Sequence, residues 1–151
     1  MTEKISRANT LIDSKSPRDT QIIGAKIGKS LNPGDILALY GELGAGKTCF
    51  VKGLAQGLKI STEVKSPSFS IINEYPGDIP LIHMDFYRIT KAIELEDLGW
   101  MEYLDADAIV VVEWAERIRN LLPSRRIDVY FQILNETARR LEIITVDDSG
   151  N

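Results

Sequence analysis

Residues 41–48 have the types and spacing of a loop that binds phosphate. They read Gly-Glu-Leu-Gly-Ala-Gly-Lys-Thr, which fits the pattern G-x-x-x-x-G-K-S/T. In such a loop, backbone N–H groups and the dipole of the following helix converge on one anionic phosphate. Gly44 and Gly46 can adopt positive φ angles and let the backbone approach phosphate oxygens closely. Lys47 would bring its charge to the outer phosphates, and Thr48 its hydroxyl to Mg²⁺.

The predicted nucleotide-binding residues are the loop and the start of the helix behind it. They are Gly41, Leu43, Gly44, Ala45, Gly46, Lys47, Thr48 and Cys49. A tight strand-to-helix turn without a ligand is the alternative, but the apolar run 36–40 directly before the loop favours nucleotide binding. The chain has no Asn-Lys-x-Asp sequence, the usual guanine-reading element, so the predicted cofactors are ATP and Mg²⁺.

Glu113 is the predicted second ligand of the metal. It follows four apolar β-branched residues, 109–112, within the strongly β-prone run 108–114. Nucleotide sites in open α/β sheets lie at the carboxyl ends of the strands, where an acid can reach a Mg²⁺ ion held against ATP. We therefore expect Thr48 and Glu113 to bind the metal together.

Asp85 is the predicted partner of Glu113 in hydrolysis. It belongs to the strand pattern 82–88, whose alternation places its side chain with those of His83 and Tyr87. Phosphoryl transfer depends on positioning and charge neutralisation, so Asp85 would hold Mg²⁺ through water or orient the attacking water. The predicted catalytic residues are Asp85, Glu113 and Lys47.

Each candidate also has a structural interpretation that the sequence leaves open. Glu113 could be a surface acid at a strand end, and Asp85 could form a salt bridge with Arg88. His83 alone is better explained as a hydrogen-bonded structural residue than as a base. Trp114 is better explained by packing beside the strand than by contact with the nucleotide.

The elements that would position these residues alternate between helical and strand patterns. Helices are predicted at 17–31, 47–58, 92–98 and 115–122. Strands are predicted at 36–40, 68–75, 80–87, 108–114, 127–134 and 140–146, with hairpins at 68–87 and 127–146. The fold class is therefore α/β, a P-loop NTPase-like layered sandwich with parallel central strands and antiparallel additions, in a single ATPase domain over residues 1–151.

Composition limits the possible partners. A net charge of −4 argues against unaided binding of DNA or RNA, which phosphate neutralisation would have to drive. Apolar runs stay short of the ~20 residues that span a bilayer, and the first residues have no apolar signal core, so no membrane partner and a cytoplasmic location are expected. The lone Cys49 is expected to pack rather than react. Six arginines of the C-terminal third are expected on a solvated surface: Arg117, Arg119, Arg125, Arg126, Arg139 and Arg140.

Six blocks of sequence, taken together, resemble the bacterial TsaE family. They are residues 41–48, 66–69, 73–75, 83–88, 94–99 and 112–114, and they span nearly the whole chain. The resemblance implies an ATPase required for threonylcarbamoyl modification of adenosine in tRNA. It also implies that the chain joins partners of the TsaD and TsaB type, and that tRNA is reached only through their complex.

The same resemblance implies roles for individual residues. Thr48 and Glu113 would bind Mg²⁺, residues 44–48 would surround the phosphates, Asp85 would assist hydrolysis, and residues 66–75 would act as a switch segment. Intrinsic activity would be low and stimulated by the partners. The family usually has Thr where this chain has Ser68, which keeps the hydroxyl, and commonly has Thr in place of Cys49.

Two other functions fit a small P-loop domain. One is a kinase that phosphorylates a metabolite, although the chain lacks an arginine-rich lid between the site strands. The other is a scaffold that binds nucleotide without hydrolysing it.

Overall fold

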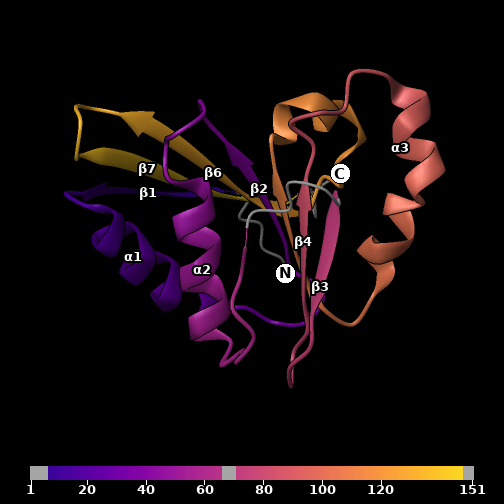
Figure 1. Cartoon of the computed structure of the whole chain (residues 1–151), viewed down its shortest axis with the longest axis horizontal. Helices are drawn as coiled ribbons and strands as arrows, with labels where there is room; N and C mark the ends of the chain where they lie inside the picture. Colours follow the sequence, from indigo (N-terminus) through magenta and orange to yellow (C-terminus); the bar gives the residue numbers. More distant parts are fainter. Residues whose placement is uncertain (1–6, 66–70, 148–151) are drawn as a thin grey trace.

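The computed structural model describes residues 7–65 and 71–147, whose strands form one sheet with helices on both faces (Figure 1). The strands are β1 (Arg7–Ser14), β2 (Ile36–Tyr40), β3 (Ile72–Tyr75), β4 (Leu81–Asp85), β5 (Ile109–Glu113), β6 (Arg126–Ile133) and β7 (Arg139–Val146). The α-helices are α1 (Pro17–Ser30), α2 (Lys47–Gly57) and α3 (Ala92–Leu98), and two 3₁₀ helices are η1 (Trp100–Asp105) and η2 (Ala115–Leu121).

The sheet has a parallel centre and antiparallel additions, as predicted. Its order is β1-β7-β6-β2-β5-β4-β3, in which β4, β5, β2 and β6 run parallel. The two predicted hairpins, β3–β4 and β6–β7, supply antiparallel strands on either side of that centre. Every residue of β2 and β5 is buried, as expected for parallel strands covered on both faces.

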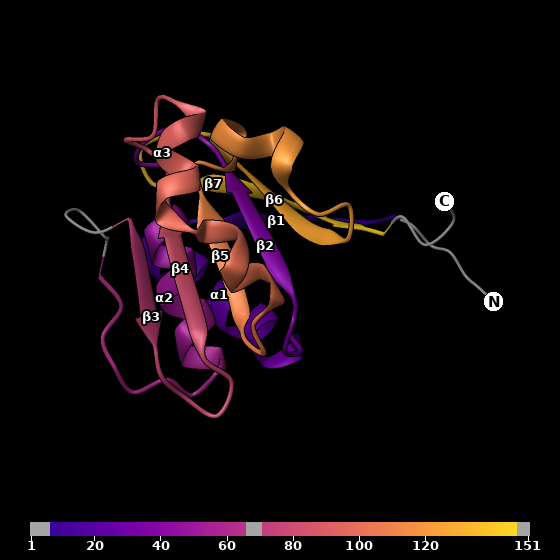
Figure 2. The ribbon, with the colours of Figure 1, turned by 90° about the vertical axis from the view of Figure 1, so that its right-hand side faces the viewer.

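Successive side chains of the central strands enter two different cores. Leu37 and Leu39 of β2 pack beneath α1 and α2, whereas Ala38 and Tyr40 pack on the face that carries α3, η1 and η2. Figure 2 shows α1 and α2 together on one side of the sheet and α3 on the other. The carboxyl ends of β2, β4 and β5 therefore lie between two separately packed layers.

Helices α1 and α2 touch backbone to backbone through glycines. A Cβ added to Gly53 would lie 2.0 Å from the Gln21 carbonyl oxygen, and one added to Gly24 would lie 2.3 Å from that of Phe50. Gly28 and Gly57 make similarly close approaches one turn further along. Only glycine fits at these contacts, so they fix how α2 lies against the rest of the domain.

Several local features differ from the sequence predictions. The unpredicted β1 pairs antiparallel with β7, and η1 follows α3 directly. Residues 115–121 form a 3₁₀ helix broken at Ile118 instead of an α-helix. The first hairpin strand is described from Ile72 onward, and residues 66–70 of that prediction lie outside the described ranges. Within those ranges, no helix is long and apolar enough to cross a membrane.

Candidate functional site

The phosphate-loop sequence joins β2 to α2 in the expected strand–loop–helix setting. Gly44 and Gly46 have φ angles of 83° and 100°, which L side chains rarely adopt. Gly46 is the N-cap of α2, where no side chain makes a capping hydrogen bond and the first turn carries no acidic residue. Helix N–H groups without a side-chain cap suit an anion, so the loop can bind a phosphate.

The other predicted nucleotide-binding residues lie along this loop with different exposures. Leu43 is at the exposed tip with 71% of its surface accessible, whereas Ala45 is fully buried against the core. Cys49 is partly buried on the first turn of α2, and it is a free thiol. The loop therefore presents mainly its backbone to a ligand, and Thr48 at its end is partly exposed.

Two residues far along the chain hold the loop in place, and sequence reasoning missed both. An Arg139 Nη2–H donates to the Gly44 carbonyl at 3.0 Å, and the Gly41 N–H donates to Glu116 Oε2 at 3.3 Å. Arg139 also donates to the Asn135 carbonyl in the β6–β7 turn. The sequence offered no signal for these contacts, because each joins residues that are far apart in the chain. The prediction had placed Arg139 among the solvated arginines.

Lys47 is buried beneath its own loop. Its Nζ donates to the Gly41 carbonyl and lies 3.7 Å from the centroid of the Trp114 ring. Burial lowers the pKa of Lys47, while the nearby carboxylates of Glu116 and Glu113 raise it. Trp114 itself has a positive φ of 58°. The indole therefore lies beside the loop lysine rather than only packing against the sheet.

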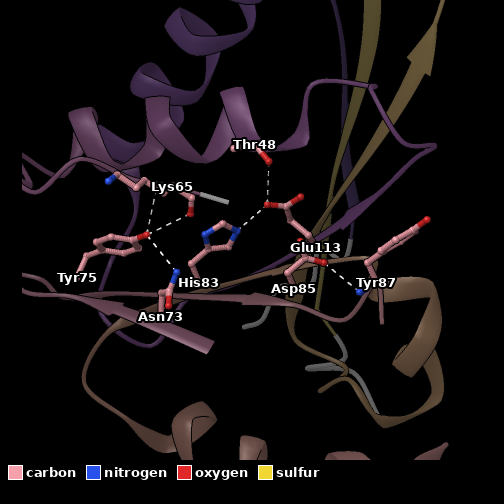
Figure 3. Close-up of polar contacts among 8 residues, drawn as sticks. All are labelled: Thr48, Lys65, Asn73, Tyr75, His83, Asp85, Tyr87 and Glu113. Carbon is pink, nitrogen blue, oxygen red and sulfur yellow. Dashed lines mark hydrogen bonds and ion pairs between the residues drawn. The ribbon is translucent and has the colours of Figure 1, made fainter. Parts of the chain in front are cut away.

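The Glu113 carboxylate points at the loop (Figure 3). It is 3% exposed at the end of β5, and its Oε2 accepts from Thr48 Oγ1 at 3.4 Å and from His83 Nε2 at 2.6 Å. The strand order explains this meeting, because β5 lies between β2, which leads to the loop, and β4, which carries His83. The predicted metal ligands, Thr48 and Glu113, are therefore neighbours in space.

Asp85 lies opposite Glu113 in the β4–β5 register. Its Oδ1 accepts from the Tyr87 N–H at 3.0 Å, and its described hydrogen bond is not to Arg88. Burial raises the pKa of Asp85; the Tyr87 N–H opposes this shift and the Glu113 charge adds to it. Tyr87 lies beyond the end of β4, half exposed and tilted against Trp114.

Tyr75, the last residue of the predicted switch segment, is hydrogen-bonded to Lys65, the residue directly before that segment. Its hydroxyl accepts from the Lys65 N–H at 3.2 Å, contacts the Lys65 carbonyl at 3.3 Å, and accepts from Asn73 Nδ2 at 3.4 Å (Figure 3). Residues 66–70 of the segment lie outside the described ranges, so the expected ordering by nucleotide stays a prediction.

These donors fit a magnesium ion that arrives with a nucleotide. A hydroxyl and a carboxylate are hard oxygen ligands, which Mg²⁺ prefers. The described ranges contain no group of three or more His, Cys, Asp or Glu side chains that could hold a metal. Because Mg²⁺ usually completes its shell with waters and substrate phosphates, Thr48 and Glu113 would be its protein ligands.

Comparisons with known proteins agree with one another. The family model described as threonylcarbamoyl adenosine biosynthesis protein TsaE matches residues 14–141. A tRNA threonylcarbamoyladenosine biosynthesis protein TsaE of Bacillus subtilis is 42% identical over 132 residues, covering 87% of this chain and 82% of the relative. One of Treponema pallidum is 38% identical, covering 86% and 96%. The crystal structure of Bacillus subtilis YdiB has a TM-score of 0.81 and 33% identity, covering 97% and 91%.

Proposed function

Since this chain belongs to the TsaE family of threonylcarbamoyl adenosine biosynthesis proteins, we propose that it serves that pathway as a magnesium-dependent ATPase. One observation supports this most strongly: the carboxylate of Glu113, delivered by β5, faces the hydroxyl of Thr48 at the start of α2. A P-loop hydroxyl and a carboxylate from a neighbouring strand end are the two protein ligands that Mg²⁺ bound to ATP needs.

The residues around that pair have distinct tasks in the proposal. Backbone N–H groups at the start of α2 hold the phosphates. Lys47 turns from the Gly41 carbonyl toward the outer phosphates, where its charge neutralises theirs. Asp85, two residues from His83 on the same strand face, accepts a hydrogen bond from the attacking water or holds a water of the metal shell. Bound Mg²⁺ would polarise the phosphoryl oxygens.

The partners in the proposal come from the family resemblance. Turnover of ATP would reset a complex with proteins of the TsaD and TsaB type, and the chain would reach tRNA only through that complex, in the cytoplasm. A net charge of −4 supports this division of work, since RNA binding relies on basic surface. We expect slow hydrolysis by the chain alone and faster hydrolysis beside its partners.

Phosphate release in a single turnover tests the proposal. The chain is mixed with labelled ATP and Mg²⁺, alone and with the two partners, and both free phosphate and any phosphorylated acceptor are measured. Release of free phosphate that the partners accelerate, together with formation of modified adenosine in tRNA, is the expected result. Transfer of the label to an acceptor would instead identify a kinase, and binding without release a nucleotide-gated scaffold.

A further inference from the structure

Among the described residues, His83 and Thr48 both hydrogen-bond the Glu113 carboxylate, and the bond from His83 is the shorter. The His83 Nε2 to Glu113 Oε2 distance is 2.6 Å, whereas the Thr48 hydroxyl is 3.4 Å from the same oxygen. The His83 side chain is fully buried, so water does not compete for this bond. Figure 3 shows the imidazole and the hydroxyl approaching the same Glu113 oxygen from different sides. The orientation of Glu113 is therefore set mainly from β4.

With Glu113 ionised, as a metal ligand is, the proton of this bond resides on His83 Nε2. A carboxylate oxygen only accepts, and an unprotonated ring nitrogen at this distance would place two lone pairs against each other. The other ring nitrogen, Nδ1, is buried and has no hydrogen-bond partner among the described residues. Within the described part of the chain, the imidazole thus hydrogen-bonds Glu113 through one nitrogen and has no partner at the other.

A buried nitrogen without a partner among the described residues is a cost to the fold. A polar atom taken out of water without a new hydrogen bond destabilises a protein. A leucine at this buried strand position would avoid that cost, so packing alone does not explain a histidine. Residues that break a local rule of stability are concentrated at functional sites.

We propose that His83 is a positioning residue of the metal site. Its Nε2–H fixes the Glu113 carboxylate toward Thr48, which leaves a Glu113 oxygen free to face Mg²⁺ when ATP binds. This rests on the proposed function, in which Glu113 is a metal ligand. Hydrogen bonds to the ligands of a metal orient them, and losing such a partner typically costs about 10–100-fold in metal affinity.

Two substitutions separate the hydrogen bond from the bulk of the ring. His83→Gln keeps an N–H donor at about the reach of Nε2, whereas His83→Asn reaches only as far as Nδ1. The readout is the ratio of ATP affinity with Mg²⁺ to ATP affinity in EDTA, measured by calorimetry at equal folded fraction. We expect His83→Asn to reduce the Mg²⁺ effect by about 10–100-fold and His83→Gln to restore most of it. Affinity in EDTA should not change in either variant.

A second readout needs no substitution at this position. His83 is the only histidine of the chain, so ¹⁵N-histidine labelling gives ring signals of one residue without assignment. We expect a protonated Nε2 in slow exchange with water. Its proton signal should shift in Glu113→Gln, because the acceptor loses its charge.

The outcomes separate this inference from the proposed function. A proton on Nδ1 with Nε2 bare, or an equal Mg²⁺ effect in wild type and His83→Asn, would overturn the positioning role alone. A wild-type chain whose ATP affinity ignores Mg²⁺ would overturn the metal site itself, and the role of His83 with it.

Discussion

The two sides of the candidate site are built in opposite ways. The loop side, residues 41–48, is contiguous in sequence and works through backbone groups whose geometry depends on Gly44 and Gly46. The carboxylate side consists of His83, Asp85 and Glu113, which come from two strands and work through side chains. Each side can be altered while the other stays intact. We therefore expect ATP binding, which depends on the loop side, to be separable by mutation from ATP hydrolysis, which depends on the carboxylate side.

The loop side is also supported differently from the carboxylate side. Behind it, α1 and α2 are held together by glycine contacts that tolerate no added atom. The chain after Glu113 enters the short, irregular η2, which packs on the other face of the sheet, through the positive φ of Trp114. A helix packed closely against α1 holds the loop, and a buried hydrogen bond from His83 holds the acid.

Lys47→Ala should break the loop side with the largest effect of the substitutions considered. Truncating one partner of a buried, hydrogen-bonded charge contact costs about 2–5 kcal/mol, so MgATP affinity should fall by a factor on the order of 30 to several thousand. Burial lowers the pKa of Lys47, which means that keeping its charge inside the protein costs free energy. Removing the side chain removes that cost, so the variant should still fold. Calorimetry measures the MgATP affinity and thermal melts measure the stability of the fold. Lys52→Ala on the same helix is the control for both. A Lys47→Ala chain that cannot fold without ATP would contradict this.

Glu113→Gln should break the carboxylate side while sparing the loop side. The neutral amide keeps the shape of the side chain but loses the charge that faces Thr48. Removing one such electrostatic group typically lowers turnover by about 10²–10³-fold. Phosphate release measures the loss, and ATP affinity in EDTA should match wild type. Glu116→Gln, which keeps an oxygen for the Gly41 N–H, is the matched control. Equal turnover in Glu113→Gln and wild type would remove the assigned role.

Asp85→Asn should slow hydrolysis and stabilise the nucleotide-free protein. A positioned acid or base contributes about 10²-fold or more to rate. Burial raises the folded-state pKa of Asp85, so stability falls as pH rises from the unfolded-state pKa through the folded-state pKa, and the cost is complete only above the latter. Asp85→Asn should therefore melt at a higher temperature than wild type above that folded-state pKa, and the two melting temperatures should converge at acidic pH. ATP hydrolysis by the wild type should fall as the pH is lowered and Asp85 becomes protonated. If wild type and Asp85→Asn had the same melting temperature at every pH, the stability cost assigned to Asp85 would be wrong.

Gly53→Ala should weaken the support of the loop side without touching the carboxylate side. The added Cβ would lie 2.0 Å from the Gln21 carbonyl oxygen, and overpacking of this kind costs about 1–3 kcal/mol. Chemical denaturation measures the change. Gln56→Ala, exposed on the same helix, should stay within about 0.5 kcal/mol of wild type. If both variants matched wild type, α1 and α2 would not be held by this contact.

The sequence predicted most of the fold because its signals are local. The apolar run before the loop, the Val-rich strand ending at Glu113 and the two hairpins needed only their own residues, and all appear in the structure. Strand β1 was missed because its polar sequence and its Leu11, 65% exposed, carry no core pattern. It is an edge strand whose stability comes from pairing with β7.

The candidate site was predictable only in part, because only some of its signals are local in sequence. The loop and its acid could be named from residue types, but their contact depends on β5 lying between β4 and β2. The bond from His83 to Glu113 and the bond from Arg139 to Gly44 join residues brought together by strand order. A single sequence does not specify that order, so these supporting residues could not be foreseen.

A crystal structure with a non-hydrolysable ATP analogue and Mn²⁺ in place of Mg²⁺ tests the central claim most directly, because the anomalous signal locates the cation. The account predicts one peak bonded to Thr48 Oγ1 and to the phosphates, with the Glu113 carboxylate as a ligand directly or through a single water. A cation bound to the phosphates with Glu113 turned away from it would contradict the account.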